Sequence, residues 1–199
     1  MITVGLTGGI ASGKTMIEEW FEEVGIPVYD ADRIYKKLAE KGEVLYNKII
    51  DAFGDGFLDR NGAIDWQKLG RRVFSDKTAR NRLNQLTHPI IKDRFKQIKR
   101  REKKENSPII VFSVPLLYEA DFVDLVDVVI VVYVDETTQI KRLRKRDDIT
   151  KKTARKKINA QMPLDIKKSL ADIVIDNRGT PVATKKRFEE VLGMLRSET

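Results

Sequence analysis

Hydrophobic residues along the chain gather into short runs that are separated by longer segments of mixed polarity. The runs cover residues 2–6, 28–29, 109–112, 128–134 and 173–175, and β-branched residues dominate most of them. Uninterrupted apolar runs of this length are typical of parallel strands that are buried on both faces of a sheet. We therefore predict a strand at each run.

The segments between these runs show helical periodicity. Ile17, Trp20, Phe21 and Val24 recur at the i, i+3, i+4, i+7 spacing, which predicts a helix with one face on the sheet. Further helices are expected over residues 32–41, 46–53, 66–74, 78–105, 137–146, 151–160 and 184–195. Strands that alternate with helices predict an α/β protein with a parallel sheet. The long helical stretch between the second and third strands is expected to be an insertion beside the site rather than a separate domain.

The composition is typical of a folded, soluble protein. The 199 residues suit one domain, and no apolar run approaches the roughly 20 residues that a membrane span needs. The absence of cysteine excludes disulfides and thiol catalysis and favours the cytoplasm. The single histidine, His88, argues against a histidine-based metal cluster. We expect a cytoplasmic monomer that binds no membrane.

The net charge of +8 comes largely from two basic runs, residues 92–104 and 141–157. Such runs can indicate nucleic-acid binding. In the first run, however, Ile91, Phe95 and Ile98 maintain a core-facing stripe, which favours a solvated helix face. For the second run we favour cations that close over bound phosphates, so no nucleic-acid partner is expected.

The most specific motif joins the first predicted strand to the helix after it. Eight residues fit the P-loop pattern G-x4-G-K-[ST]: Gly8, Gly9, Ile10, Ala11, Ser12, Gly13, Lys14 and Thr15. Backbone N–H groups of such a loop and the helix N-terminus surround a polyphosphate. Lys14 is expected to reach the β- and γ-phosphates, and the Thr15 hydroxyl to ligate Mg²⁺. The chain is therefore predicted to bind a nucleoside triphosphate.

Two carboxylates, Asp30 and Asp32, directly follow the second predicted strand. The carboxyl ends of parallel strands are where α/β proteins place ligands, so both are expected beside the P-loop. A carboxylate there can take the proton of an acceptor hydroxyl or hold a metal-bound water. The structural alternative is that Asp32 caps the next helix while Asp30 pairs with Arg33. The residue pattern leaves both interpretations open.

Two further segments carry candidate contacts to the acceptor. A helical region is interrupted at Thr87, His88 and Pro89. This segment either contacts the acceptor or is a helix start at which proline is the first residue. The segment 114–119 follows the third predicted strand. It either contacts the acceptor or forms a hydrophobic turn under the sheet.

Two other segments suit a bound nucleotide. Arg142 and Arg146 lie four residues apart and hence on one helix face, where they can neutralise a transferring phosphoryl group. Flexible segments that bear such arginines often close as lids. A loop that includes Asn177 and Gly179 follows the last predicted strand, where it could contact an adenine ring.

Together these segments resemble the dephospho-coenzyme A kinase family, which acts in the last step of coenzyme A synthesis. The resemblance extends from residue 4 to about residue 180, with every segment in the family's order. The matching segments are residues 6–14, 30–32, 88–89, 114–117, 139–147, 160–161 and 171–177.

The resemblance implies a three-layer αβα P-loop NTPase fold with a five-stranded parallel sheet. It implies a core of about residues 1–31, 107–136 and 170–199, a helical coenzyme-binding region of about 32–106, and a lid of about 137–169. The implied reaction moves the γ-phosphoryl group of ATP to the ribose 3′-hydroxyl of dephospho-CoA, with Mg²⁺.

The resemblance also implies roles for individual residues. Asp32 matches the general base, Lys14 the phosphate lysine, and Arg142 and Arg146 the lid cations. Met16, Asn177 and Gly179 are expected on the ATP side, although the family often has a small hydroxylic residue in place of Met16. The segments expected to line the acceptor pocket contribute His88, Pro89, Pro115, Leu116 and Leu117, and Asp30 is a candidate metal contact through water.

Three other functions were considered. Another small-molecule P-loop kinase would share the loop, carboxylate and lid, and would differ only in the acceptor pocket. A GTPase switch is disfavoured, because the D-x-x-G matches at residues 51–54 and 176–179 are misplaced and no N-K-x-D motif is present. A nucleic-acid-binding ATPase has only charge in its favour, since aromatic and basic residues are not interleaved.

Overall fold

The structure, a computed structural model, describes residues 1–199. It divides into two compact units, which we call the sheet unit (residues 1–29 and 98–199) and the helical unit (residues 30–97). No helix in either unit combines the length and the apolar character needed to cross a bilayer.

The sheet contains the predicted strands in the order β2-β3-β1-β4-β5. Strand β1 pairs in parallel with β3 and β4, and β4 pairs in parallel with β5. The strand bounds are β1 (Ile2–Gly8), β2 (Val28–Asp30), β3 (Ile109–Ser113), β4 (Val128–Tyr133) and β5 (Ile173–Asp176). These bounds differ from the expected ones by at most two residues, and the parallel α/β prediction is confirmed.

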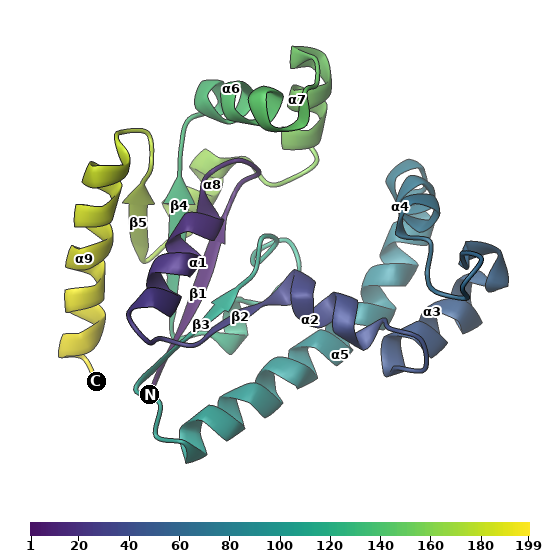
Figure 1. Cartoon of the computed structure of the whole chain (residues 1–199), viewed down its shortest axis with the longest axis horizontal. Helices are drawn as coiled ribbons and strands as arrows, with labels where there is room; N and C mark the ends of the chain where they lie inside the picture. The colour runs from purple at the N-terminus through teal and green to yellow at the C-terminus, as the bar shows by residue number, and fades with distance from the viewer. The chain divides into compact units, whose positions relative to one another are not determined.

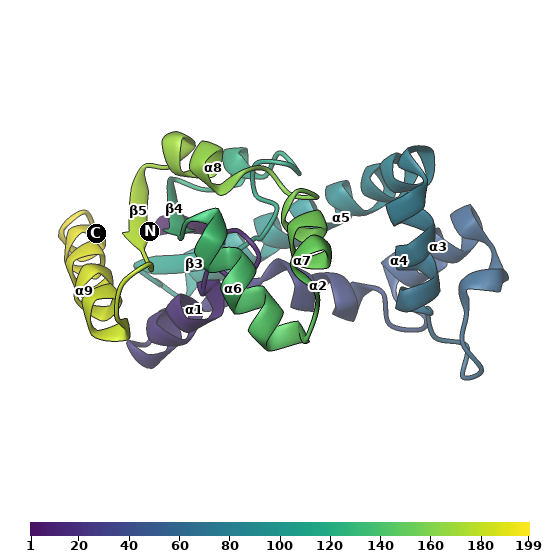
Figure 2. The ribbon, with the colours of Figure 1, turned by 90° about the horizontal axis from the view of Figure 1, so that it is seen from above.

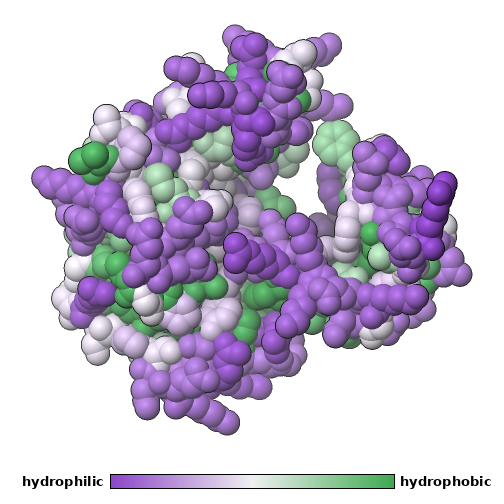
Figure 3. Space-filling view, viewed as in Figure 1, coloured by the Kyte–Doolittle hydropathy of each residue, from purple (hydrophilic) through white to green (hydrophobic).

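Helices cover both faces of this sheet. The sheet unit contains α1 (Lys14–Glu23), α6 (Glu136–Asp147), α7 (Lys151–Ile158), α8 (Leu164–Leu170), α9 (Pro181–Ser197) and the short 3₁₀ helix η2 (Val123–Leu125). Helices α1 and α9 share one face, and α8 lies against the other (Figures 1 and 2). Helices α6 and α7 pack on each other, and their surface is mainly hydrophilic (Figure 3).

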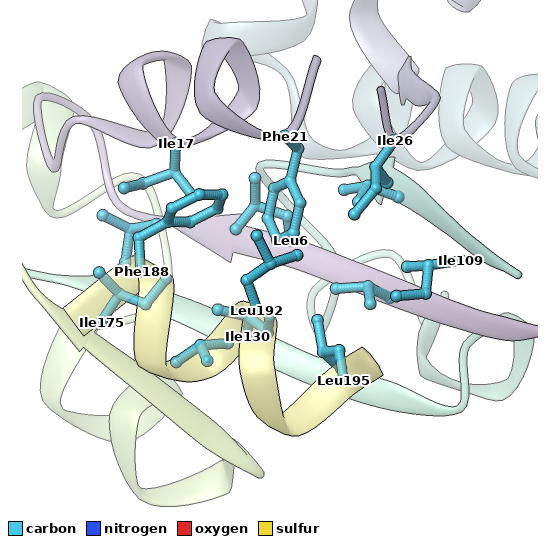
Figure 4. Packing of buried hydrophobic residues seen from close by; sticks show 14 residues of the cluster. Leu6, Ile17, Phe21, Ile26, Ile109, Ile130, Ile175, Phe188, Leu192 and Leu195 are labelled. Atoms are coloured by element: carbon cyan, nitrogen blue, oxygen red, sulfur yellow. The ribbon is translucent and has the colours of Figure 1, made fainter. Parts of the chain in front are cut away.

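The main hydrophobic core lies between the sheet and the α1–α9 layer. Leu6 of β1, Ile17 and Phe21 of α1, and Phe188 of α9 are fully buried and point toward one another (Figure 4). The rings of Phe21 and Phe188 meet edge to face with centroids 4.9 Å apart. Each such buried side chain contributes about 1.5–3 kcal/mol of transfer free energy. This packing holds β1 and α1 rigidly on both sides of the loop that joins them.

The helical unit has a separate core. It contains α2 (Ala31–Leu38), α3 (Val44–Phe53), the 3₁₀ helix η1 (Asp55–Phe57), α4 (Trp66–Ser75) and most of α5 (Lys77–Lys104). Its buried cluster consists of Ala39, Leu45, Ile49, Ile64 and Leu69. The seven helices with expected bounds are all present, with ends that differ by at most three residues.

One local prediction is wrong, and one helix was missed. Helix α5 continues through Pro89, so the segment 87–89 neither interrupts nor starts a helix. Proline removes one backbone donor, but Leu83 and Ile90, on either side of it, pack on the same core cluster, and this packing holds the helix together. Helix α8 was not expected, because seven residues hold too few apolar positions to show a helical period.

Candidate active site

The P-loop connects the end of β1 to the start of α1. Strand β1 ends at Gly8 and α1 begins at Lys14, with Gly13 as its N-cap at φ +93°. The chain turns tightly in between, because the Ser12 N–H donates to the Gly9 carbonyl over 3.1 Å. A helix N-terminus of this kind presents free backbone donors and a partial positive charge to an anion.

Two predicted nucleotide-side residues meet at the Ser12 carbonyl. Asn177 is buried and donates from Nδ2 to this oxygen over 2.7 Å, while its Oδ1 accepts a hydrogen bond from Thr184. Arg142 of α6 donates to the same carbonyl over 3.4 Å and to the Asn177 carbonyl over 2.8 Å. A Cβ at position 13 would collide with the Asn177 side chain, so this close approach requires glycine.

Two glutamines hold the backbone of Ile10 in the P-loop. Gln139 of α6 donates from Nε2 to the Ile10 carbonyl over 2.8 Å. Gln161, after α7, accepts the Ile10 N–H over 2.9 Å. Ile10 and Ala11 also pack on the buried residues of α6 and α7. The two glutamine contacts were not predicted, since neither spacing nor charge points to them; their presence in segments that carry the family resemblance was the one available hint.

Lys14 lies in a buried polar cluster at the start of α1. Its Nζ is 2.5 Å from Glu18 Oε1, one helical turn further on, and donates over 2.5 Å to Ser113 Oγ at the end of β3. Ser113 in turn donates to Glu18. Neither partner was predicted from the sequence, although the i, i+4 spacing of Lys14 and Glu18 is the usual pattern of a helical ion pair. The cluster joins the phosphate lysine to the end of β3.

The other two helix-start residues differ in exposure. Thr15 is exposed at the second position of α1, whereas Met16 packs partly buried against the main core. No group of three or more His, Cys, Asp or Glu side chains in residues 1–199 is placed to hold a metal ion. A site with few protein ligands suits Mg²⁺, which usually keeps several waters and is bound together with substrate phosphates.

The segment 114–119, which follows β3, is only partly exposed to solvent. Leu117 is fully buried, and its side chain would touch a Cβ at Gly5 of β1. Leu116 is 43% exposed, and Pro115 is half-buried. The Pro115 carbonyl accepts hydrogen bonds from Thr7 Oγ1 and from Lys167 Nζ. The surface that this segment offers to a ligand therefore comes from Pro115 and Leu116.

Four predicted site residues belong to the helical unit. Asp30 is the N-cap of α2 and accepts the Arg33 N–H over 2.7 Å. Asp32 is exposed in the first turn of that helix, so the alternative in which Asp32 is the cap is wrong. His88 is half-buried in α5, where burial, and secondarily the charge of Lys92, lower its pKa. Pro89, next to it, is exposed.

Two predicted residues make no contact with the P-loop. Arg146 is exposed and donates to Asp147 over 2.8 Å, although it shares a helix with Arg142. Gly179 is exposed in the loop between β5 and α9.

The class of protein follows from the fold and this geometry. A glycine-rich loop from a central parallel strand opens into a helix N-terminus, with a lysine at the helix start and an arginine from a neighbouring helix on the loop's main chain. This combination defines a P-loop kinase.

Comparison with known proteins identifies the family. The family model described as "Dephospho-CoA kinase" matches residues 2–182. A dephospho-CoA kinase from Oryza sativa subsp. japonica is 48% identical over 193 residues, which cover 96% of this chain and 84% of that one. One from Bacillus cereus is 42% identical over 191 residues, 96% of each chain. The solved dephospho-CoA kinase from Campylobacter jejuni superposes with a TM-score of 0.71 at 25% identity, and the match covers 99% of this chain and 98% of that one. The chain belongs to the dephospho-CoA kinase family, whose members are ATP-dependent kinases.

Proposed function

We propose that the chain transfers the γ-phosphoryl group of ATP to the ribose 3′-hydroxyl of dephospho-CoA and so forms CoA and ADP. The observation that carries this proposal is the P-loop with Lys14 at the start of α1 and Arg142 on its main chain, in a chain that belongs to this family. Both substrates are polyanions, so the net charge of +8 favours their encounter with the protein.

On the donor side, the P-loop backbone and Lys14 bind the phosphates of ATP. The ammonium of Lys14 is paired with the Glu18 carboxylate. When ATP binds, the ammonium also contacts the β- and γ-phosphates, and its interaction with Glu18 weakens. Asn177, Gly179 and Met16 lie around the nucleotide. Buried Asn177 supports this role because it fixes the P-loop carbonyl at Ser12.

The Thr15 hydroxyl and the ATP phosphates hold Mg²⁺. The exposed position of Thr15 in the first turn of α1 supports this role, and water on Asp30 is a candidate additional contact. The ion supplies positive charge that stabilises the phosphate oxygens during transfer.

On the acceptor side, Asp32 accepts the proton of the 3′-hydroxyl as the oxygen attacks phosphorus. Its exposed carboxylate in the first turn of α2 supports this role. Asp30 is already used as a helix cap, which favours Asp32 as the base. The proposed acceptor contacts are His88 and Pro89 of the helical unit and Pro115 and Leu116 of the sheet unit. Leu117 is fully buried, so it supports its neighbours and does not touch the substrate itself.

Arg142 and Arg146 provide the cations of a lid of about residues 137–169. Arg142 reaches the P-loop directly, so it stabilises charge on the transferring group, while Arg146 joins it when the lid closes. We expect the enzyme to act as a cytoplasmic monomer.

The proposed function is tested by mixing purified protein with MgATP and dephospho-CoA and measuring CoA by mass spectrometry. CoA and ADP are expected in equal amounts. Turnover of a different acceptor hydroxyl, without formation of CoA, would overturn the proposal in favour of another small-molecule kinase.

The proposed base is tested by Asp32→Asn, with Asp30→Asn as the matched control. Asn caps a helix about as well as Asp, so the control keeps α2 intact. We expect Asp32→Asn to lower kcat by roughly 10²–10⁴-fold with ATP affinity nearly unchanged. A larger loss from Asp30→Asn than from Asp32→Asn would exchange the roles of the two carboxylates.

A further inference from the structure

Lys167 is a fully buried cation that no step of the proposed reaction uses. It lies on α8, and its side chain is 0% exposed. A buried ammonium is unfavourable unless it is paired and hydrogen-bonded. Lys167 Nζ is 2.9 Å from Glu119 Oε1 and donates to the Pro115 carbonyl over 2.8 Å. Burial lowers the pKa of Lys167, and the Glu119 carboxylate opposes that shift.

Both partners of Lys167 carry a second hydrogen bond. The Pro115 carbonyl also accepts Thr7 Oγ1 over 3.2 Å, and Thr7 precedes the first glycine of the P-loop. Glu119 Oε1 also accepts the Met162 N–H over 2.9 Å, in the linker between α7 and α8. Lys167 is therefore the centre of a network that joins β1, the segment 114–119 and the end of the expected lid.

The segment that this network holds has a defined shape. Its backbone turns back on itself, because the Ala120 N–H donates to the Leu116 carbonyl and the Phe122 N–H donates to the Leu117 carbonyl, each over 2.9 Å. Leu117 anchors it in the core, and this leaves Leu116 exposed. Lys167 itself has no surface for a ligand, so any effect it has on substrate binding must pass through this segment.

The geometry points to Lys167, with Glu119, as a positioning residue that sets where Pro115 and Leu116 meet the acceptor substrate. This inference rests on the proposed function, because that function makes Pro115 and Leu116 part of the acceptor pocket. The ion pair of buried Lys167 with Glu119 fixes the Pro115 carbonyl, which Thr7 also contacts, and holds the apolar surface of Leu116 in one place. The Met162 contact ties the same segment to the end of the lid.

The test compares Lys167→Met with Lys186→Met, which removes an exposed lysine from α9. Methionine keeps the length of the side chain and removes its charge and donors. Two measurements are made: hydrogen exchange at the amides of Ala120, Phe122 and Met162, and steady-state kinetics with each substrate varied. Glu119→Gln is the second variant, because it keeps an oxygen acceptor for the Met162 N–H if Lys167→Met does not fold.

We expect faster exchange at all three amides in Lys167→Met, faster exchange at Ala120 and Phe122 but not at Met162 in Glu119→Gln, and none of this change in Lys186→Met. The KM for dephospho-CoA is expected to rise about 10-fold or more, and the KM for ATP to change less than about twofold. A purely structural role for Lys167 would lower stability without separating the two KM values, and that result would overturn the inference.

The two proposals fail in different ways. Wild-type protein that forms no CoA would refute the proposed function, whatever the variants do. In that case, unchanged exchange at Ala120 and Phe122 in Lys167→Met would also overturn the role of Lys167 in holding the segment 114–119, and faster exchange would support that role while the link to dephospho-CoA is refuted. If wild-type protein does form CoA, an unchanged KM for dephospho-CoA in both variants overturns the inference alone.

Discussion

The chain contains two basic helical stretches of similar composition that are built in different ways. In α5, residues 92–104, the buried side consists of apolar residues such as Phe95 and Ile98, as the sequence pattern predicted. Its cations contact neighbouring groups: Arg101 pairs with Glu102 over 2.9 Å and Lys99 pairs with Asp127 over 3.4 Å. These contacts stabilise the folded structure and do not involve the P-loop.

The second stretch, residues 141–157, spans α6 and α7. Here Arg142 is half-buried and donates to the carbonyls of Ser12 and Asn177. Two other cations, Arg146 and Lys157, pair with Asp147, and the contact from Lys157 links α7 to α6. The comparison teaches that the density of positive charge does not identify a phosphate site. What distinguishes the second stretch is one arginine, Arg142, that donates to the main chain of the P-loop, and this contact supports the proposed phosphate site.

Within these two stretches, the largest expected effect comes from removing that arginine. Arg142→Ala deletes both hydrogen bonds to the P-loop region, and we expect kcat/KM to fall by about 10²–10³-fold. Arg144→Ala, from the exposed side of the same helix, is the matched control. Steady-state kinetics with both substrates measure the difference. Equal losses from the two variants would show that overall charge, and not the position of Arg142, decides activity.

The next effect concerns stability in the α5 stretch. Buried Glu102 accepts hydrogen bonds from Tyr29 over 2.6 Å and from Ser107 over 2.7 Å. We expect Glu102→Gln to cost about 1–3 kcal/mol of unfolding free energy and about 2–10 °C in Tm, while both KM values stay unchanged. The control is exposed Glu105→Gln, and thermal unfolding measures the shift.

The loss of stability in Glu102→Gln is expected to depend on pH, because Glu102 is a titratable group. The hydrogen bond from Tyr29, followed by those from Ser107 and Arg101, lowers its pKa below the ordinary 4.5. A lowered pKa means that this carboxylate stabilises the fold above pH 4.5 and that the contribution is lost as the pH falls through the lowered value. The gap in Tm between wild type and Glu102→Gln should therefore narrow on acidification. A gap that is constant with pH would contradict this account.

A smaller effect is expected at the junction of α6 and α7. The hydrogen bonds from Arg146 and Lys157 lower the pKa of Asp147 from 3.8 to about 2. We expect Lys157→Met to raise it toward 3.8, as measured by NMR titration of the carboxyl carbon. The stabilisation from Asp147 is present above about pH 4 and is lost as the pH falls toward 2. An unchanged titration in the variant would mean that Arg146 alone holds the carboxylate.

The smallest effect is expected for the exposed cations of α5. Lys96→Ala combined with Arg100→Ala removes two solvent-facing charges, and we expect a change within about 0.5 kcal/mol of stability and no change in either KM. Chemical unfolding and kinetics measure both. A clear rise in KM for ATP or dephospho-CoA would show that this stretch also binds phosphates, and a sharp, structure-specific gel shift that these substitutions abolish would revive the nucleic-acid alternative.

Local signals in the sequence were sufficient for most of the fold and for the P-loop. Apolar runs with few polar residues gave the five strands, and the motif from Gly8 to Thr15 gave the phosphate loop, because both depend on residues that are neighbours in the chain. Features that depend on one short segment meeting a distant one were missed. Helix α8 is seven residues long, and its buried side includes a lysine, which no hydrophobic pattern predicts.

The sequence by itself therefore determined the fold class and the family, and it predicted where a triphosphate binds, since spacing and backbone preference are local properties. Only the tertiary structure decided which polar side chains act together. It placed Asp30 and not Asp32 at the cap of α2, and it brought Gln139 to the carbonyl and Gln161 to the N–H of Ile10. The physical reason is that a hydrogen bond depends on distance and direction between groups, and packing sets these across more than a hundred residues of chain.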